Sequence, residues 1–108
     1  MTTQRWDNSR RRPDAARIKA AISPVVFYMA DNSSMPAPKV SKGWVSGGLC
    51  QFHGDKHAGN FRINADTGAF ICFSCCAKGS DIIAYYQMRY SLTFREALIR
   101  LVNAWGIY

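Results

Sequence analysis

The alternation of apolar and polar residues in the middle of the chain predicts a small antiparallel ribbon. In the segment "NFRIN", Phe61 and Ile63 alternate with polar residues, which is the period of a strand that buries one face. The next residues, "ADTG", favour a turn, and "AFICF" has the composition of a returning partner strand. Upstream, the segment "KVSKGWVSGGL" is expected to form a further strand hairpin that leads into Cys50.

Helical patterns precede the ribbon. Residues 13–22, "PDAARIKAAI", start with proline and are rich in alanine, which predicts a helix. The following segment, "SPVVFYM", either forms a second short helix capped by Ser23 or runs as a strand, and the pattern leaves both open. Residues 31–38, "DNSSMPAP", have the composition of a loop.

Two more helices are predicted after the ribbon. Ser80 and Asp81 open the first, "DIIAYYQMRY", and Thr93 and Glu96 have the spacing of a capping box at the start of the second. The apolar residues of this last helix fall on one face, which we expect to pack against the ribbon. They are Phe94, Ala97, Leu98, Leu101, Val102 and Trp105.

Length, composition and charge narrow the class of protein. A chain of 108 residues with 48% hydrophobic and 13% aromatic residues suits one small folded domain. It has 14 Lys and Arg against 7 Asp and Glu, a net charge of +7, and six of the basic residues lie in the first 19. A basic excess suits a polyanion such as nucleic acid, and it suits a merely solubilising surface equally well.

No apolar run approaches the roughly 18 residues of a membrane span, and the polar start "MTTQRWDNSRRRPDAAR" does not resemble a signal peptide. We therefore expect a cytoplasmic protein without a membrane partner. Cysteines are usually reduced in the cytoplasm, so a cluster of four indicates metal binding or redox chemistry before it indicates disulfides.

The cysteines and histidines carry the strongest chemical signal. Cys50 and His53 are separated by two residues, eighteen residues follow, and Cys72 and Cys75 repeat the two-residue gap. Two such tight turns at the ends of paired strands can complete a tetrahedron around one ion, as Zn²⁺ requires. Three thiolates and one imidazole leave no open coordination position, so the spacing predicts a single structural zinc ion that stabilises the fold.

Three alternatives to this ligand set stay open. Cys76 adjoins Cys75 and could replace it as a ligand, although the spacing favours Cys75. His57 is a second candidate imidazole, and its position after a turn is more typical of a surface residue. The pair Cys72 and Cys75 also has redox spacing, but the βαβ context of a thioredoxin-like motif is missing.

With these residues in place, the sequence resembles the N-terminal zinc-binding domain of bacterial DnaG-type primases. That family has the form Cys-Pro-Phe-His, an acidic residue with Lys, an aromatic strand, Cys-Phe-Gly-Cys-Gly, a further Gly and an apolar helix. The resemblance covers residues 44–102, and "LTFREALIRL" looks like the family's closing helix. The matching positions are Cys50, Phe52, His53, Asp55, Lys56, Phe61, Cys72, Phe73, Cys75, Gly79 and the helix from Ile82.

Some positions depart from the family pattern. Gln51 stands in place of the family's proline, and Ser74 and Cys76 replace two glycines. The segment "KHAGNF" replaces Lys-Thr-Pro-Ser-Phe and is one residue longer. None of these changes removes a ligand, so they bear on fine geometry and DNA contacts and not on the metal.

The resemblance and the element pattern together predict an α+β fold. A small antiparallel zinc-ribbon sheet would have flanking helices at both ends. We expect a flexible basic arm at residues 1–12 and one primase-type domain at 13–108, with the ribbon core at 44–79 and C-terminal helices at 81–103.

In the family this domain is not catalytic but helps the primase to select and hold single-stranded template. The chemistry belongs to a separate Toprim-type domain that binds magnesium through clustered carboxylates. This chain has one glutamate, Glu96, and scattered aspartates, so we predict that it is not an enzyme on its own.

Single-strand binding calls for basic groups that follow phosphates and aromatic side chains on which bases stack. The predicted nucleic-acid contacts are Lys56, Arg62, Lys78 and Phe61 on the ribbon, with Arg10, Arg11 and Arg12 in the arm. The ribbon aromatics are Trp44, Phe61, Phe70 and Phe73. Because alternate strand residues point inward, we expect at least two of them to be core, and we expect Phe73 to shield the metal.

Two other classes of function remain open. The chain could be a zinc ribbon that docks on a polymerase, helicase or transcription protein through its last helix, or a fragment of a full-length primase. Because it starts with Met and ends after a finished helix, we expect a small protein that acts in trans with a primase or helicase and comes from a phage or mobile element.

Overall fold

The structure is a computed structural model, and it describes residues 14–107. The predicted basic arm at residues 1–12, with Arg10, Arg11 and Arg12, lies outside the described residues. Within 14–107 the order is two helices, four strands and two helices, so the predicted α+β class is confirmed. The helices are α2 (Ala15–Ala21), α3 (Pro24–Asp31), α4 (Ile82–Tyr90) and α5 (Phe94–Trp105), and the strands are β1 (Trp44–Ser46), β2 (Phe61–Asn64), β3 (Phe70–Cys72) and β4 (Lys78–Gly79).

Side-chain caps explain where the helices begin. Asp14 accepts a hydrogen bond from the Ala16 N–H at 3.0 Å and starts α2. Ser23 accepts from the Val26 N–H at 3.4 Å, with Pro24 in the first turn, so the segment 24–31 is a helix and the strand alternative is wrong. The predicted caps of α4 and α5 are confirmed: Asp81 caps α4, and α5 starts with a complete capping box.

The four strands form one antiparallel sheet in the order β1-β2-β3-β4. Val45, Ile63 and Phe70 lie in one row of register partners, and all three are buried. The neighbouring row runs Ser46, Arg62, Ile71 and Lys78 across all four strands, and its members are partly or fully exposed. The sheet therefore has a buried inner face and an outer face toward solvent.

The predicted hairpin in residues 39–49 does not form. That segment contains the single strand β1, which pairs with β2 instead. The chain leaves the sheet at Gly48, which has a φ of +81°, and Leu49 donates to the Ser34 hydroxyl at 2.8 Å. The buried amide of Asn32 fixes the same turn by donating to the carbonyls of Gly47 and Leu49 at 2.9 and 2.7 Å.

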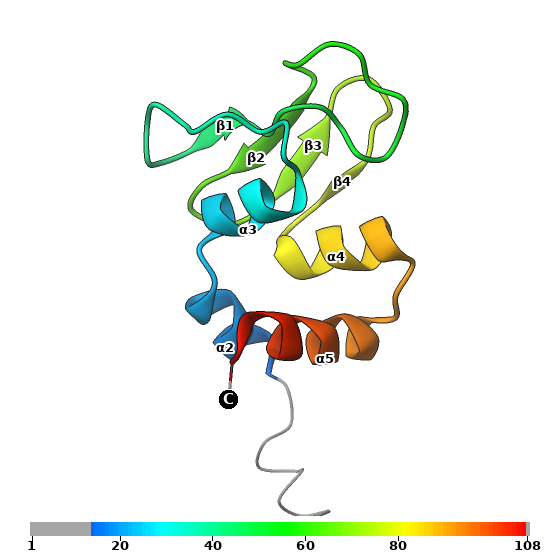
Figure 1. The fold of residues 1–108 in the computed structure, drawn as a ribbon. Coiled ribbons are helices and arrows are strands. Elements are labelled where there is room, and N and C mark those ends of the chain that lie inside the picture. The colour runs from blue at the N-terminus through cyan, green and yellow to red at the C-terminus, as the bar shows by residue number, and fades with distance from the viewer. Residues whose placement is uncertain (1–13, 108) are drawn as a thin grey trace, which may run out of the picture.

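The helices form layers beneath the sheet. Figure 1 shows α3 and α4 next to the strands, with α2 and α5 on the side away from them. The last helix packs against α4 and α2, so the expectation that its apolar face lies on the ribbon is wrong. The buried side of α5 is formed by Ala97, Leu98 and Leu101.

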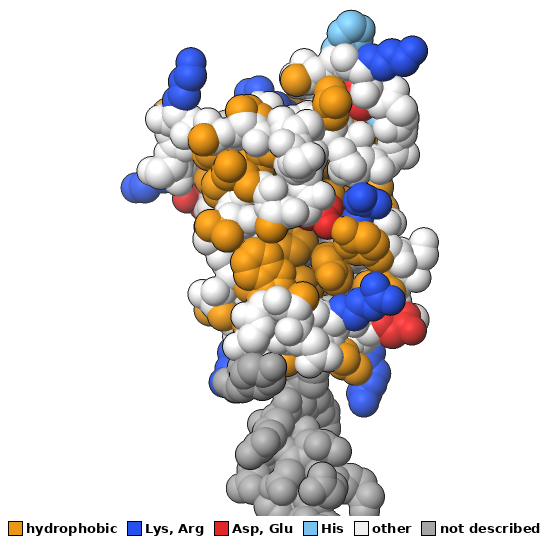
Figure 2. Space-filling model, in the orientation of Figure 1, with side chains coloured by type: hydrophobic (Ala, Val, Ile, Leu, Met, Phe, Trp, Pro, Cys, Tyr) orange, Lys and Arg blue, Asp and Glu red, His pale blue; other side chains and the backbone are white. Residues whose placement is uncertain are grey.

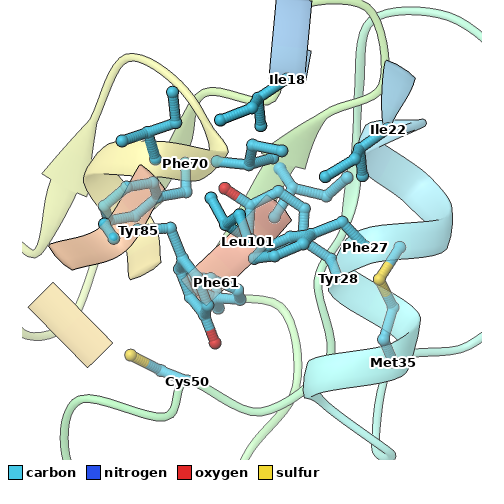
Figure 3. Close-up of a cluster of buried hydrophobic side chains, with 14 of the residues drawn as sticks. Ile18, Ile22, Phe27, Tyr28, Met35, Cys50, Phe61, Phe70, Tyr85 and Leu101 are labelled. Carbon is cyan, nitrogen blue, oxygen red and sulfur yellow. The ribbon is translucent and has the colours of Figure 1, made fainter. Parts of the chain in front are cut away.

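Aromatic rings fill the space between the sheet and the helices (Figure 3). The Tyr85 ring lies at centroid distances of 4.8 Å from Tyr28, 5.4 Å from Phe70 and 6.2 Å from Phe61. Tyr28 donates its buried hydroxyl to the Gly68 carbonyl at 2.6 Å, which ties α3 to the turn between β2 and β3. Among the helices of residues 14–107, none is both long and apolar enough to cross a membrane.

Candidate metal centre and outer sheet face

The four predicted metal ligands come together in space. Their ligand atoms all lie within 4.8 Å of one another. Cys50 and His53 stand on the turn after β1, Cys72 ends β3, and Cys75 follows in the turn toward β4. In residues 14–107 this is the only group of three or more His, Cys, Asp or Glu residues with such geometry.

The distances within this group fit a tetrahedral zinc ion. The Sγ atoms of Cys50 and Cys75 are 3.8 Å apart, and Cys72 Sγ lies 3.4 Å from His53 Nε2. Zn–S bonds of about 2.3 Å and Zn–N bonds of about 2.0–2.1 Å would place tetrahedral ligands about 3.8 Å (S to S) and about 3.6 Å (S to N) apart. These two measured separations therefore match those of a tetrahedral zinc site.

Backbone hydrogen bonds shape both turns toward the centre. The N–H of Phe52 points at Cys50 Sγ at 3.4 Å, and the N–H of Cys75 points at Cys72 Sγ at 3.5 Å. Asp55 closes the first turn by accepting from the Cys50 N–H at 2.8 Å. This hydrogen bond is the main reason that the pKa of Asp55 lies below its usual value.

The thiol environments differ. Burial raises the pKa of Cys50, with only partial compensation from the Phe52 N–H. At Cys72 burial also acts upward, but the N–H groups of Cys75 and Ser74, together with His53, bring the net pKa down. A divalent cation at the centre would stabilise all the thiolates, because a coordinating thiol loses its proton to solvent and binds the metal as the thiolate.

The rival ligands lie outside the group. Cys76 is exposed and has a φ of +67°, and its N–H donates to the Cys72 carbonyl at 2.9 Å. His57 is exposed on the loop that follows Asp55. All four cysteines are free thiols, and three of them share one cluster with a histidine, which favours metal binding over redox chemistry.

The predicted DNA contacts separate into three sets. Arg62 and Lys78 lie in the same outer row of the sheet, each paired with Ile71. Lys56 is exposed on the loop after the first metal turn. Phe61 has 0% exposure and packs on the inner face, so the structure removes it from the candidate base contacts.

Two aromatic side chains do reach solvent on the outer face. Trp44 is 48% exposed and Phe73 is 66% exposed. The expected shielding of the metal by Phe73 stays a prediction. Phe61 and Phe70 are the two buried members of the aromatic set, which confirms that at least two would be core. In "AFICF", Phe73 has the opposite parity to Phe70, so the sequence places the two rings on different faces without indicating which face is buried.

Two short turns at the ends of paired strands carry a Cys₃His donor set, and helices cover one face of the sheet. This arrangement defines a metal-binding zinc-ribbon protein. The sequence matches the CHC2 zinc finger family, the zinc ribbon of DnaG-type primases, over residues 32–108. The chain belongs to this family.

Several DNA primases are similar over part of the chain. The enzyme of Streptomyces coelicolor is 40% identical over 60 residues, which are 56% of this chain and 9% of the relative. The primase of Deinococcus radiodurans is 37% identical over 60 residues, 56% of this chain and 10% of the relative. The primase of Borreliella burgdorferi is 35% identical over 69 residues, which are 64% of this chain and 13% of the relative. The chain thus spans about a tenth of the length of these relatives.

Proposed function

We propose that the chain is a primase-type zinc module that holds single-stranded template DNA on the outer face of its sheet. It would act together with a catalytic domain that synthesises the primer. The family membership and the similarity to DNA primases support the setting. The surface itself supplies the physical argument.

One feature of the outer face carries the proposal. Trp44, Arg62, Ile71 and Phe73 line an open hollow of about 330 Å³. Two exposed rings and one guanidinium thus share a small apolar depression. Single-strand sites combine aromatic stacking platforms with cations that contact the backbone, and this hollow brings both together.

The surrounding charges extend this surface. Lys78 stands two strands from Arg62 in the same row, and Lys56 lies on the loop of the first metal turn. We propose that Arg62, Lys78 and Lys56 contact phosphates while Trp44 and Phe73 stack on unpaired bases. A duplex would bind less well because its base faces are already covered by their neighbours.

The metal has a structural part in this proposal. We propose that one Zn²⁺ is bound by Cys50, His53, Cys72 and Cys75. Phe73 lies directly after the ligand Cys72, so the ion would fix the turn that presents this ring. The closed donor set leaves no position for substrate, so the ion would organise the surface and take no part in chemistry.

We propose that primer synthesis belongs to another domain. The chain has 7 Asp and Glu in all, and within residues 14–107 they join no metal-ligating group. We propose that the purified chain makes no primers when it is given template, nucleotides and Mg²⁺. Template-dependent synthesis by the pure protein would refute this part of the proposal.

A binding titration tests the template proposal. The zinc-loaded protein would be titrated with a fluorescent single-stranded oligonucleotide, its duplex and a strand of the same length in which abasic sites replace the bases. We expect the single strand to bind at least tenfold more tightly than either of the others. Equal affinity for all three would mean that only phosphates are contacted, and no affinity for the single strand at low salt would refute template binding.

A further inference from the structure

Helix α3 is apolar on its outer side as well as on its inner side. From Pro24 to Ala30 the helix carries no charged side chain, and its only polar side-chain group is the hydroxyl of the buried Tyr28. Phe27 and Tyr28 fill the core, yet Val26 is 53% exposed and Met29 is 38% exposed. A helix without a polar face is typically covered on both sides, so within residues 14–107 the outer side of α3 lacks a partner.

A hollow continues this apolar surface toward the loop before β1. It has a volume of about 620 Å³ and is lined in part by Val25, which lies one helical turn before Met29. Opposite lies Val40, which is 59% exposed. The lining residues, which with Val26 and Met29 we call the α3 groove, are Ser23, Val25, Pro38, Lys39, Val40, Ser41 and Ala65.

The chemistry of the α3 groove differs from that of the outer sheet face. Its apolar side chains are aliphatic, and no aromatic ring lines it for a base to stack on. It also lies apart from the proposed template surface, because α3 packs on the inner side of the sheet through Tyr28 and Phe61, whose ring centroids are 6.4 Å apart. Figure 2 shows apolar side chains gathered over α3 and below it, with basic side chains at the edge of the same face.

Charge narrows the choice of occupant. Lys39 lines the groove, and Lys42 follows three residues later; both are exposed. The nearby carboxylate of Asp66 accepts a hydrogen bond from the Gly43 N–H at 2.9 Å. A second copy of this chain, with its net charge of +7, would place like charges against this rim.

We infer that the α3 groove docks a partner protein through a segment that carries aliphatic side chains next to carboxylates. The aliphatic side chains would fill the hollow beside Val25 and Val40 and cover Val26 and Met29. The carboxylates would meet Lys39 and Lys42. Because the groove and the hollow on the outer sheet face share no lining residue, the module can hold a partner and a template at the same time.

The test uses three synthetic amphipathic peptides and the zinc-loaded chain. The first has Leu and Ile on one side and Glu on the other, the second has Lys in place of Glu, and the third has Ser in place of Leu and Ile. Binding is measured by fluorescence anisotropy. We expect the first peptide to bind at least tenfold more tightly than the other two.

Variants locate the binding site. Val26→Glu and Val40→Glu should each weaken binding of the acidic aliphatic peptide at least tenfold, and Lys39→Glu should weaken it and flatten its salt dependence. Ile99→Glu, at a site on α5 that is 39% exposed, is the matched control and should leave the affinity unchanged. Zinc content and melting temperature confirm that every variant is folded; if Val26→Glu is not, Val40→Glu on the loop decides.

Other occupants give different results. Equal binding of the acidic and basic peptides, unchanged affinity in both valine variants, or no binding at low salt would overturn the inference. Self-association that Val26→Glu abolishes would assign the groove to a second copy and overturn it as well. A matching loss of single-strand affinity in Val26→Glu would make the groove part of the template surface, whereas loss of peptide binding alone leaves the proposed function untouched.

Discussion

Two adjacent cysteines have different environments. Cys75 Sγ lies 3.8 Å from Cys50 Sγ within the ligand group, while Cys76 is turned out by a positive φ of 67°. Residues other than glycine rarely adopt this backbone region, and the family has glycine at this position. The two-residue gap after Cys72 therefore selected the correct one of the two neighbouring cysteines.

This difference predicts the outcome of a pair of serine substitutions. Cys75→Ser removes a zinc ligand and should lower the zinc content of the purified protein from about one ion per chain toward zero, with loss of the folded ribbon. Cys76→Ser keeps the four ligands and should retain the metal. Elemental analysis of both variants measures this, and full zinc in Cys75→Ser with loss in Cys76→Ser would exchange the two assignments.

At the residue scale, spacing predicted the metal ligands but not the aromatic contacts. Cysteine and histidine in paired two-residue gaps have few uses other than binding one ion, so those four positions could be named in advance. Phe61 and Phe73 are both strand-like aromatics, and only the pairing register shows that Phe61 faces the helices and Phe73 faces solvent. The side that receives the helices is a tertiary property, and a single strand pattern does not contain it.

At the scale of the elements, β4 depends on a close approach that only glycine allows. A Cβ on Gly79 would lie 2.5 Å from Phe70 Cε1 and 3.0 Å from the Ala84 Cβ. Gly79→Ala should therefore destabilise the zinc-loaded protein by about 1–3 kcal/mol, the usual cost of overpacking. Urea unfolding measures the change, with Gly54→Ala as the control because a Cβ there meets nothing within 4 Å. Equal stability of both variants would contradict the close contact.

The capping box of α5 gives a second prediction for an element. Thr93 accepts from the Glu96 N–H at 3.1 Å, and Glu96 accepts from the Thr93 N–H at 2.8 Å. Thr93→Ala should cost about 1 kcal/mol of stability in urea unfolding, as for other N-cap residues. A loss below a few tenths of a kcal/mol would mean that packing against α2 and α4 alone holds the start of this helix.

The carboxylate of the same box should respond to pH. The hydrogen bond from the Thr93 N–H is the largest cause that lowers the pKa of Glu96 in the folded protein. Its stabilising contribution is complete above the unfolded-state pKa of about 4.3 and is lost as the pH falls through the lower folded value. The stability difference between wild type and Glu96→Gln should therefore be constant at neutral pH and shrink below about pH 4. A difference that grows in acid would contradict this.

The helices show which elements a sequence can predict. Caps at Asp81 and Thr93 are local hydrogen-bond patterns, so the starts of α4 and α5 could be predicted from the sequence, whereas at Ser23 the pattern left helix and strand both open. The packing partner of α5 could not be predicted, because an apolar face indicates that a helix is covered but does not indicate which element covers it. The expected hairpin was wrong for a similar reason. The sequence predicted a strand at β1, but β1 pairs with β2 and not with the residues next to it in the chain.

At the scale of the whole molecule, the sheet separates two surfaces. Its outer face presents Trp44, Arg62 and Phe73, and its inner face is covered by the helices, of which α3 carries the groove proposed for a protein partner. The metal turns lie at the end of the same strands, so the ion would fix the loops that border the outer face. Under the proposed function, this arrangement would let the module position a template for primer synthesis by another domain.

The central claim is that single-stranded DNA binds the outer face through one phosphate contact at Arg62 and base stacking at Trp44. The most direct test is the dependence of single-strand affinity on salt for wild type, Arg62→Ala and Trp44→Ala. Arg62→Ala should reduce the slope of log K against log salt by about 0.7, the value for one phosphate contact on a single strand. Trp44→Ala should weaken binding by about 1–3 kcal/mol and leave the slope unchanged. Arg100→Ala and Phe94→Ala, at exposed sites on α5, are the matched controls and should behave as wild type. If the affinities and slopes of all five proteins coincide, the template does not bind the outer face.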